Sequence, residues 1–166
     1  MRSELITYGL LGALAIALLA AAFTDLKRRQ IDNWLNAAIA LAAPTFWWAS
    51  GLTLWPDVAW QFGVAAGAFV ILAVLFACKM MGGGDVKLLT ALALWVQPTH
   101  FLFLVVMMSM IGGVLTILFG AVHVIRRQTG RIAIPYGVAI ASAALLTVYA
   151  KSLPALQATL PGAHVG

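Results

Sequence analysis

Acidic side chains are scarce in this chain. Its 166 residues include five Asp or Glu and ten Lys or Arg, so charged residues make up only 9% of the sequence. Hydrophobic residues make up 63%, and the mean hydropathy is +1.01. A soluble domain of this size could not cover so much apolar surface with so few charges, so we expect its solvent to be a lipid bilayer.

Several kinds of site lack their usual residues. The single cysteine, Cys78, leaves no intramolecular disulfide and no cysteine-built zinc module. There is no H-E-x-x-H motif and the three histidines lack metal-ligand spacing, so we expect no metal and no cofactor. A nucleophilic pair of Cys78 with His123 is a weak alternative, because no third residue orients it. The basic residues form no patch, which argues against nucleic acid as a partner.

Apolar runs separated by short polar breaks predict an all-α, polytopic membrane protein with about six transmembrane helices. A bilayer core of roughly 30 Å needs about 20 helical residues, and four of the runs approach or exceed that length. The second run is short and carries Pro44, and the fourth is too short to cross alone. The runs are 5–23, 34–49, 58–78, 86–96, 101–125 and 132–150. The first run has no clear cleavage site after it, so we expect a retained helix.

The basic residues predict the orientation. With the N-terminus outside, the outer segments hold only Arg2 and Lys151, which is a strong positive-inside bias. The inner loops hold the other eight: Lys27, Arg28, Arg29, Lys79, Lys87, Arg126, Arg127 and Arg131. Six spans place both termini on the extracytoplasmic side. We expect one transmembrane domain over residues 1–151 in the cytoplasmic (inner) membrane, then an irregular extracytoplasmic tail over residues 152–166.

Asp25 ends the first apolar run. A carboxylate at the edge of a hydrocarbon span costs on the order of 2.5–3.5 kcal/mol, so its position suggests a function. The alternative is that Asp25 only balances the three cations that follow it. For Asp32 and Asn33, the better interpretation is a cap on the second helix.

Asp85 follows a run of three glycines, Gly82, Gly83 and Gly84, just before the short fourth apolar run. Glycine lets another backbone approach closely, as a substrate strand would require. Because the fourth run is short, we expect the glycine loop to lie below the membrane surface as the floor of a water-accessible cavity. Asp85 could also be the N-cap of the helix that follows, and the two roles are compatible.

The predicted topology puts Asp25 and Asp85 on the same membrane face. Two neighbouring carboxylates cannot both ionise cheaply, so they share one proton. One can then act as general base on a water while the other protonates an amide carbonyl and later the leaving nitrogen. The other polar and small residues have simpler explanations. Lys87 fits snorkelling to the interface, Gly63 and Gly67 fit close helix packing, and the six tryptophans fit an interfacial belt.

Taken together, these segments resemble the type IV prepilin peptidases, which are membrane aspartyl proteases with a G-x-G-D motif. The nearest match is the short, peptidase-only branch that serves tight-adherence (Flp) pili. The matching pieces are the Asp-x5-Ile-x-Asn pattern from Asp25 to Asn33, the glycine run with Asp85-Val-Lys-Leu, and Pro135-Tyr136-Gly137.

The resemblance implies removal of the short basic leader of a prepilin at the cytoplasmic face, just before the hydrophobic helix of the pilin. It maps the catalytic pair onto Asp25 and Asp85. The implied partners are a prepilin and the lipid bilayer. The remaining matched positions would form the loop and the substrate approach: Gly82, Gly83, Gly84, Asn33, Lys87, Pro135, Tyr136 and Gly137.

The chain departs from the family pattern in two ways. Ile31-Asp32-Asn33 stands where the family usually has Ile-Pro-Asn, which adds a third carboxylate near the pair. The four-cysteine cytoplasmic domain that accompanies N-methylation has no counterpart, so we expect proteolysis without methyl transfer. Two other functions remain open: a small ion- or proton-coupled transporter, and a pilus-assembly scaffold without activity.

Overall fold

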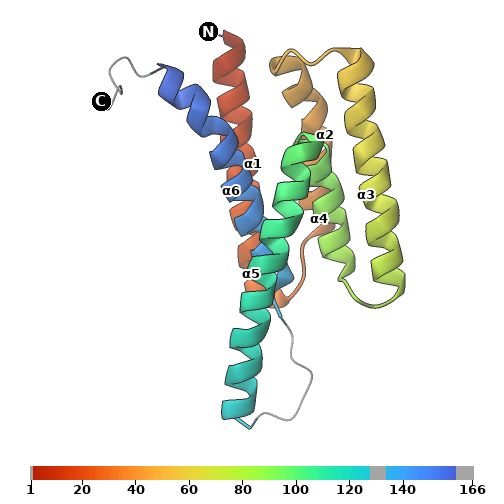
Figure 1. The fold of residues 1–166 in the computed structure, drawn as a ribbon, viewed down its shortest axis with the longest axis vertical. Coiled ribbons are helices and arrows are strands. Elements are labelled where there is room, and N and C mark those ends of the chain that lie inside the picture. The colour runs from red at the N-terminus through yellow and green to blue at the C-terminus, as the bar shows by residue number, and fades with distance from the viewer. Residues whose placement is uncertain (1, 128–133, 160–166) are drawn as a thin grey trace.

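The computed structural model describes residues 2–127 and 134–159, and within them the side chains of 3–127 and 134–150. These residues form helices and no strands. The elements are α1 (Arg2–Arg28), α2 (Asn33–Ala49), the short π-helical η1 (Leu54–Val58), α3 (Ala59–Ala77), α4 (Gly83–Ala93), α5 (Pro98–Ile125) and α6 (Tyr136–Thr159). The helices run alternately up and down, so the α1–α2 and α3–α4 connections lie at the same end of the bundle (Figure 1).

Three helical segments are long and apolar enough to cross a membrane: Ser3–Arg28, Leu54–Ala77 and Pro98–Ile125. The shorter segment Tyr136–Ala150 is also apolar. The all-helical fold class is therefore confirmed, and its helices are compatible with a membrane protein. The expected break between the fourth and fifth runs is also confirmed, but it lies at residues 94–97 and not at 97–100, because α4 ends at Ala93 and α5 begins at Pro98.

The predicted irregular tail is wrong over residues 152–159. Helix α6 continues through Pro154 to Thr159. A proline within a helix removes one hydrogen bond, while the leucine, alanine and glutamine around it are good helix formers. Residues 160–166 lie outside the described part of the chain, as do Arg131 and the first two residues of the sixth predicted run.

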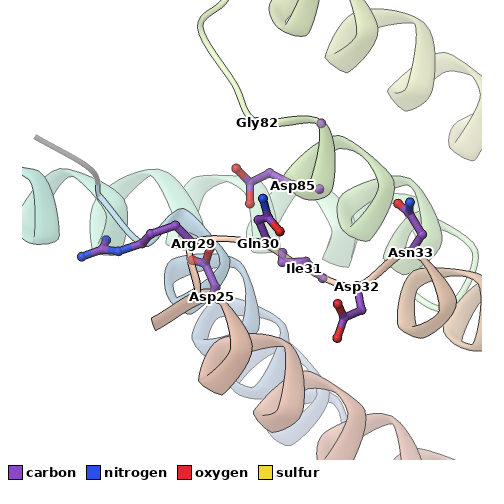
Figure 2. A pocket seen from close by; sticks show the side chains of 10 residues that line it. Asp25, Arg29, Gln30, Ile31, Asp32, Asn33, Gly82 and Asp85 are labelled. Carbon is purple, nitrogen blue, oxygen red and sulfur yellow. The ribbon is translucent and has the colours of Figure 1, made fainter. Parts of the chain in front are cut away.

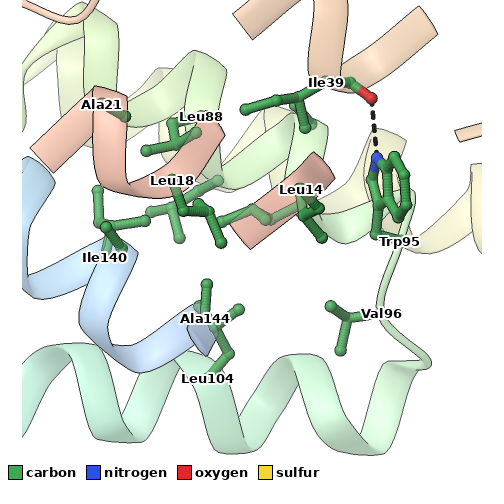
Figure 3. Packing of buried hydrophobic residues seen from close by; sticks show 14 of the residues in the cluster. Leu14, Leu18, Ala21, Ile39, Leu88, Trp95, Val96, Leu104, Ile140 and Ala144 are labelled. Carbon is green, nitrogen blue, oxygen red and sulfur yellow. Dashed lines mark hydrogen bonds between the residues drawn. The ribbon is translucent and has the colours of Figure 1, made fainter. Parts of the chain in front are cut away.

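The buried core joins both halves of the bundle. Leu14, Leu18 and Ala21 of α1 pack in one cluster with Leu88 of α4 and Ile140 of α6 (Figure 3). Buried alanines on α6 let that helix approach α1 closely: Ala139, Ala141, Ala143 and Ala144. This packing fixes α1 against the start of α6 and the middle of α4. Asp25 lies at the C-terminal end of α1, and Asp85 lies at the N-terminal end of α4.

The break between α4 and α5 is held by side-chain amides and indoles. The buried Gln61 Nε2 donates to the carbonyl oxygens of Ala93, Leu94 and Val96 at 3.2, 3.2 and 2.7 Å. Trp47 Nε1 also donates to the Leu94 carbonyl, at 2.7 Å. Carbonyls at a helix C-terminus have no partner within the helix, and these bonds satisfy them.

The predicted tryptophan belt is wrong for two of its six members. Trp47 and Trp95 are buried, and Trp95 Nε1 donates to the Ile39 carbonyl at 2.8 Å (Figure 3). An indole N–H usually finds a partner when buried, and here the partners are backbone carbonyls. The expected tight packing at Gly63 and Gly67 is also wrong, since no described heavy atom lies within 4 Å of a Cβ built at either.

Candidate active site

Asp25 occupies the last turn of α1 and is buried, with 6% of its surface exposed. Its Oδ2 accepts a hydrogen bond of 2.8 Å from the backbone N–H of Gly137. Gly137 is the second residue of α6, where a backbone N–H has no partner within the helix. The Asp25 carboxyl therefore satisfies one of the free N–H groups at the N-terminus of α6.

Position 137 has room beside Asp25 only for a glycine. A Cβ built at Gly137 would lie 2.9 Å from the Cβ, Cγ and Oδ2 atoms of Asp25. Pro135, two residues earlier, is fully buried and leads the chain into α6. The sequence assigned Pro135 and Gly137 to the substrate approach, whereas the main chain of Gly137 contacts the Asp25 carboxyl directly.

The glycine run forms the N-terminus of α4. Gly82 is the N-cap, with φ −74° and ψ 144°, and Asp85 is the third residue of the helix. The alternative in which Asp85 itself is the N-cap is therefore wrong. The chain leaves the extended conformation only after Gly82, so the helix begins two residues before Asp85. A Cβ built at Gly82 would lie 2.8 Å from Asp85 Oδ2, so the carboxyl folds back over this glycine.

Gly83 and Gly84 allow two other close approaches. A Cβ at Gly83 would lie 3.2 Å from the ring of Phe76, and a Cβ at Gly84 would lie 3.3 Å from the Cβ of Ile31. Gly84 thus lets the α1–α2 connection pass directly over the start of α4. The glycine run brings the segment after Asp25 and the helix of Asp85 together.

The two aspartates open onto one cavity of about 380 Å³. Figure 2 shows their carboxyl groups at its wall, Asp25 from the end of α1 and Asp85 from the start of α4. The α1–α2 connection and the glycine run complete the lining: Arg29, Gln30, Ile31, Asp32, Asn33, Gly82, Gly83 and Gly84. The expected convergence of two acids that are far apart in the sequence is thus present in the fold.

Asp85 is partly buried and titrates under the influence of Asp25. Burial, and then the charge of Asp25, raise the pKa of Asp85 to about 6, although the backbone of Gly82 acts in the opposite direction. Asp85 precedes the apolar part of α4 and lies outside the three membrane-length segments. When Asp25 carries the negative charge, Asp85 is therefore the carboxyl that holds its proton up to about pH 6, well above the usual range of an aspartate.

Arg29 lines the cavity, although its sequence position predicted only a cation in an inner loop. It follows α1 with a positive φ of 56°, and its guanidinium lies 5.4 Å from the centre of the Phe119 ring. Among the residues that line the cavity, it is the one Lys or Arg. Its position one helical turn after Asp25 is the signal that could have identified it, and Arg29 N donates to the Asp25 carbonyl at 2.8 Å.

Asp32 is the N-cap residue of α2, as expected, but its side chain makes no cap hydrogen bond. Instead its Oδ2 accepts from Arg28 Nη2 at 2.9 Å, and this cation one turn earlier competes for the carboxylate. Asp32 lines the cavity, yet this ion pair distinguishes it from Asp25 and Asp85.

Three residues assigned to the substrate approach have partners within the protein. Lys87 Nζ donates to Asn33 Oδ1 at 2.8 Å, which joins α4 to the start of α2. The Tyr136 hydroxyl lies 3.3 Å from the Thr116 hydroxyl. The Tyr136 ring packs on Gly112, where a Cβ would come within 3.1 Å of it. The snorkelling interpretation of Lys87 thus omits a specific contact.

In the described part of the chain, no group of three or more His, Cys, Asp or Glu side chains could hold a metal ion. Cys78 is an exposed free cysteine just after α3. The cavity lining supplies three carboxyl groups, of which Asp32 is paired with Arg28, together with one guanidinium and the amides of a glycine loop.

Comparison with known proteins identifies the family. Residues 12–117 match the family model of the type IV leader peptidase family, which is more than half of the chain and includes both cavity aspartates. The Pro135-Tyr136-Gly137 segment lies outside the matched range. No curated protein and no solved structure matches the chain. The chain belongs to the type IV leader peptidase family.

Proposed function

We propose that this protein is an aspartyl endopeptidase in which Asp25 and Asp85 form the catalytic pair. Family membership makes it a protease of the type IV leader peptidase kind. The observation that supports the aspartyl mechanism is the shared cavity, onto which carboxyl groups from the ends of α1 and α4 both open. The third carboxyl group that lines the cavity, Asp32, is paired with Arg28 at 2.9 Å.

The contacts of the two carboxyls suggest separate roles. Asp25, which accepts the Gly137 N–H, is the ionised member and acts as the general base. It removes a proton from a water whose oxygen attacks the scissile carbonyl carbon, while Asp85 donates its proton to the carbonyl oxygen. Asp25 then passes the proton it took from water to the amide nitrogen, and Asp85 takes a hydroxyl proton back from the tetrahedral intermediate as the C–N bond breaks. The products are a carboxylic acid and a free amine, and the two aspartates again hold one proton between them.

The position of the cavity suggests the side of the membrane on which cleavage occurs. The α1–α2 and α3–α4 connections lie at one end of the bundle, and this end carries Lys27 and Arg28 in the last turn of α1, Arg29 after it, and Lys79. Cationic loops remain in the cytoplasm, so we place this end there and propose six membrane-embedded helices in the inner membrane. Helix α4, with 11 residues, would leave its glycine end within reach of a substrate at the membrane surface.

The proposed substrate is a prepilin with a short basic leader followed by a hydrophobic helix. Family membership supports prepilin-type substrates, and the Flp type rests on the resemblance of the motifs in this short chain. A carboxylate-lined cavity suits a basic leader, while the apolar helix of the pilin would remain in the bilayer. We propose proteolysis without N-methylation.

The test is cleavage of a Flp-type prepilin by membranes that contain this protein. The wild type should give a shorter product, and Asp25→Asn and Asp85→Asn should each lower the rate by at least about 10³-fold, since each removes one partner in proton transfer. Mass spectrometry of the product gives the cleavage site.

Asp32→Asn is the matched control. It makes the same chemical change in the third cavity carboxylate, which is paired with Arg28, so the rate should stay within about twofold of wild type. Wild-type cleavage by Asp25→Asn or Asp85→Asn would refute the pair. Loss of activity in Asp32→Asn would assign one of the two roles to Asp32.

A further inference from the structure

Asn36 is a buried amide whose hydrogen bonding is incomplete. It lies in the first turns of α2 with only 4% of its surface exposed. Its Nδ2 donates to the Gly84 carbonyl oxygen at 3.5 Å, and its Oδ1 has no hydrogen-bond partner among the described residues. An unsatisfied buried acceptor is unfavourable for folding, so a polar side chain at this position needs another explanation.

The partner of Asn36 precedes Asp85 directly in the chain. The N-cap of α4 is a glycine, which has no side chain to cap the helix, and other elements also contact its start. Three such contacts come from the segment at the start of α2: Asn36 bonds the Gly84 carbonyl, Asn33 accepts from Lys87, and Ile31 packs on Gly84. Of these, the Asn36 bond acts on the peptide unit that joins Gly84 to Asp85.

We propose that Asn36 is a positioning residue that orients the Gly84–Asp85 peptide and so directs the Asp85 carboxyl toward Asp25. This inference rests on the proposed aspartyl protease function. The 3.5 Å distance is at the long end for a hydrogen bond. Hydrogen bonds that serve catalysis often tighten when substrate binds, and this one can shorten as the cavity fills.

A residue retained for folding and one retained for catalysis respond differently to an isosteric substitution. Asn36→Leu keeps the branched shape of the side chain and removes the unsatisfied oxygen. If Asn36 served the fold alone, this variant would be less stable than wild type and would cleave at the wild-type rate when folded. If Asn36 positions Asp85, the variant is at least as stable as wild type yet cleaves more slowly.

For Asn36→Leu we expect a melting temperature equal to or above that of wild type. We also expect kcat to fall about tenfold and KM to stay within about twofold, because the interaction lost acts on a catalytic group and not on substrate binding. The matched control is Thr147→Val. Thr147 is a buried polar residue of α6 that bonds only the Ala143 carbonyl, at 2.7 Å, and its loss should leave kcat unchanged.

Asn36→Asp gives a second, independent readout. A protonated carboxyl can donate to the Gly84 carbonyl as the amide does, whereas an ionised one cannot. The rate relative to wild type should therefore be highest at the acidic end of the pH range and fall as pH rises. The same ratio for Asn36→Leu should be constant with pH.

Wild-type kcat in folded Asn36→Leu would overturn the inference. The inference would also be overturned if the rate of Asn36→Asp relative to wild type varied with pH in the same way as that of Asn36→Leu. This comparison applies even if the leucine variant is poorly folded at high temperature. Wild-type protein that cleaves no prepilin would instead refute the proposed function. A wild type that cleaves beside an equally active Asn36→Leu would refute the positioning role alone.

Discussion

The two ends of helix α4 are built differently. At its C-terminal end, the Gln61 amide and the Trp47 indole donate four hydrogen bonds to the carbonyls of Ala93, Leu94 and Val96, at 2.7 to 3.2 Å. At its N-terminal end there is no side-chain cap, and one bond of 3.5 Å from Asn36 reaches the glycine run beside a cavity. One short helix thus has a strongly bonded end and a weakly bonded end.

The difference between the two ends indicates which part of α4 can move. The carbonyl end is buried and satisfied, so moving it would break several hydrogen bonds at once. The glycine end carries Asp85 and has fewer bonds to lose. Catalytic groups are often located on the less stable part of a fold, because they must move when substrate binds. We therefore expect substitutions at the cavity end to change activity, and substitutions at the other end to change stability.

After the substitutions of the two aspartates, the largest effect on activity near the cavity should come from Gly137→Ala. The added methyl group would meet three atoms of Asp25 at 2.9 Å, so either the carboxyl or the start of α6 must move. We expect kcat/KM for prepilin cleavage to fall by at least about 100-fold, since misplacing a catalytic group by roughly 1 Å has that effect. The measurement is initial rate with detergent-solubilised protein.

Gly113→Ala is the control for that change. It makes the same substitution in α5, where no described heavy atom lies within 4 Å of the new carbon. Its kcat/KM should equal that of wild type. A Gly137→Ala enzyme within a few-fold of wild type would mean that the contact with Asp25 is not needed for catalysis.

Gly82→Ala should separate activity from stability at the cavity end. The new methyl group would lie 2.8 Å from Asp85 Oδ2, which is the far end of a side chain that can rotate away. We expect roughly a tenfold loss of kcat with little change in melting temperature, because the carboxyl moves while the helix stays. A parallel loss of stability would show that the glycine run is needed mainly for folding.

At the carbonyl end, Gln61→Leu should lower stability and spare activity. The Ala93 and Val96 carbonyls lose their donor, while the Leu94 carbonyl keeps its bond from Trp47, and the loss costs roughly 2–4 kcal/mol. Thermal unfolding followed by circular dichroism should show the loss, while kcat below the transition stays within about twofold of wild type. Gln97→Leu, at an exposed glutamine just before α5, should be nearly neutral. A large loss of kcat in folded Gln61→Leu would contradict the division between the two ends.

The smallest effect is a pH-dependent change in stability at Asp85. Its folded-state pKa of about 6 exceeds the ordinary value of 3.8, so the folded state holds the proton more tightly than the unfolded state. Stability due to this group is therefore lost as pH rises from about 4 to above about 6. Asp85→Asn removes the loss, and should stabilise the protein by on the order of 1 kcal/mol at about pH 8 and by nothing at about pH 4. Equal melting temperatures of wild type and variant at both pH values would contradict a raised pKa.

Much of the fold could be predicted because a bilayer protein has a simple sequence signature. Long apolar runs predict helices, since only helices satisfy their own backbone hydrogen bonds in lipid. The need for a break between the fourth and fifth runs followed from length, because residues 86–125 in one helix would be too long for a membrane. Its place was predicted a few residues too late, since Pro98 is the first residue of α5. The end of α6 could not be predicted the same way, since alanine-rich sequence continues as helix beyond a proline that usually ends one.

The candidate site could be predicted in part. Asp25 and Asp85 stand out because acids are rare in apolar sequence, and both line the cavity. The partners of these acids could not be found, because Gly137 and Asn36 are distant in sequence from the groups they contact. Asn36 did offer a signal, since it is a polar residue on the buried face of an otherwise apolar helix.

Composition and spacing alone determined that the chain is helical, that it suits a membrane, and that two of its few acids are candidates for chemistry. These properties depend on the free energy of placing each residue type in lipid or in a helix, which is a local quantity. Only the tertiary structure decided that the amide of Gly137 bonds Asp25, that Lys87 bonds Asn33, and that the two ends of α4 differ in their hydrogen bonding. Each of these depends on which helix ends meet, and that is decided by how the side chains of the whole bundle pack.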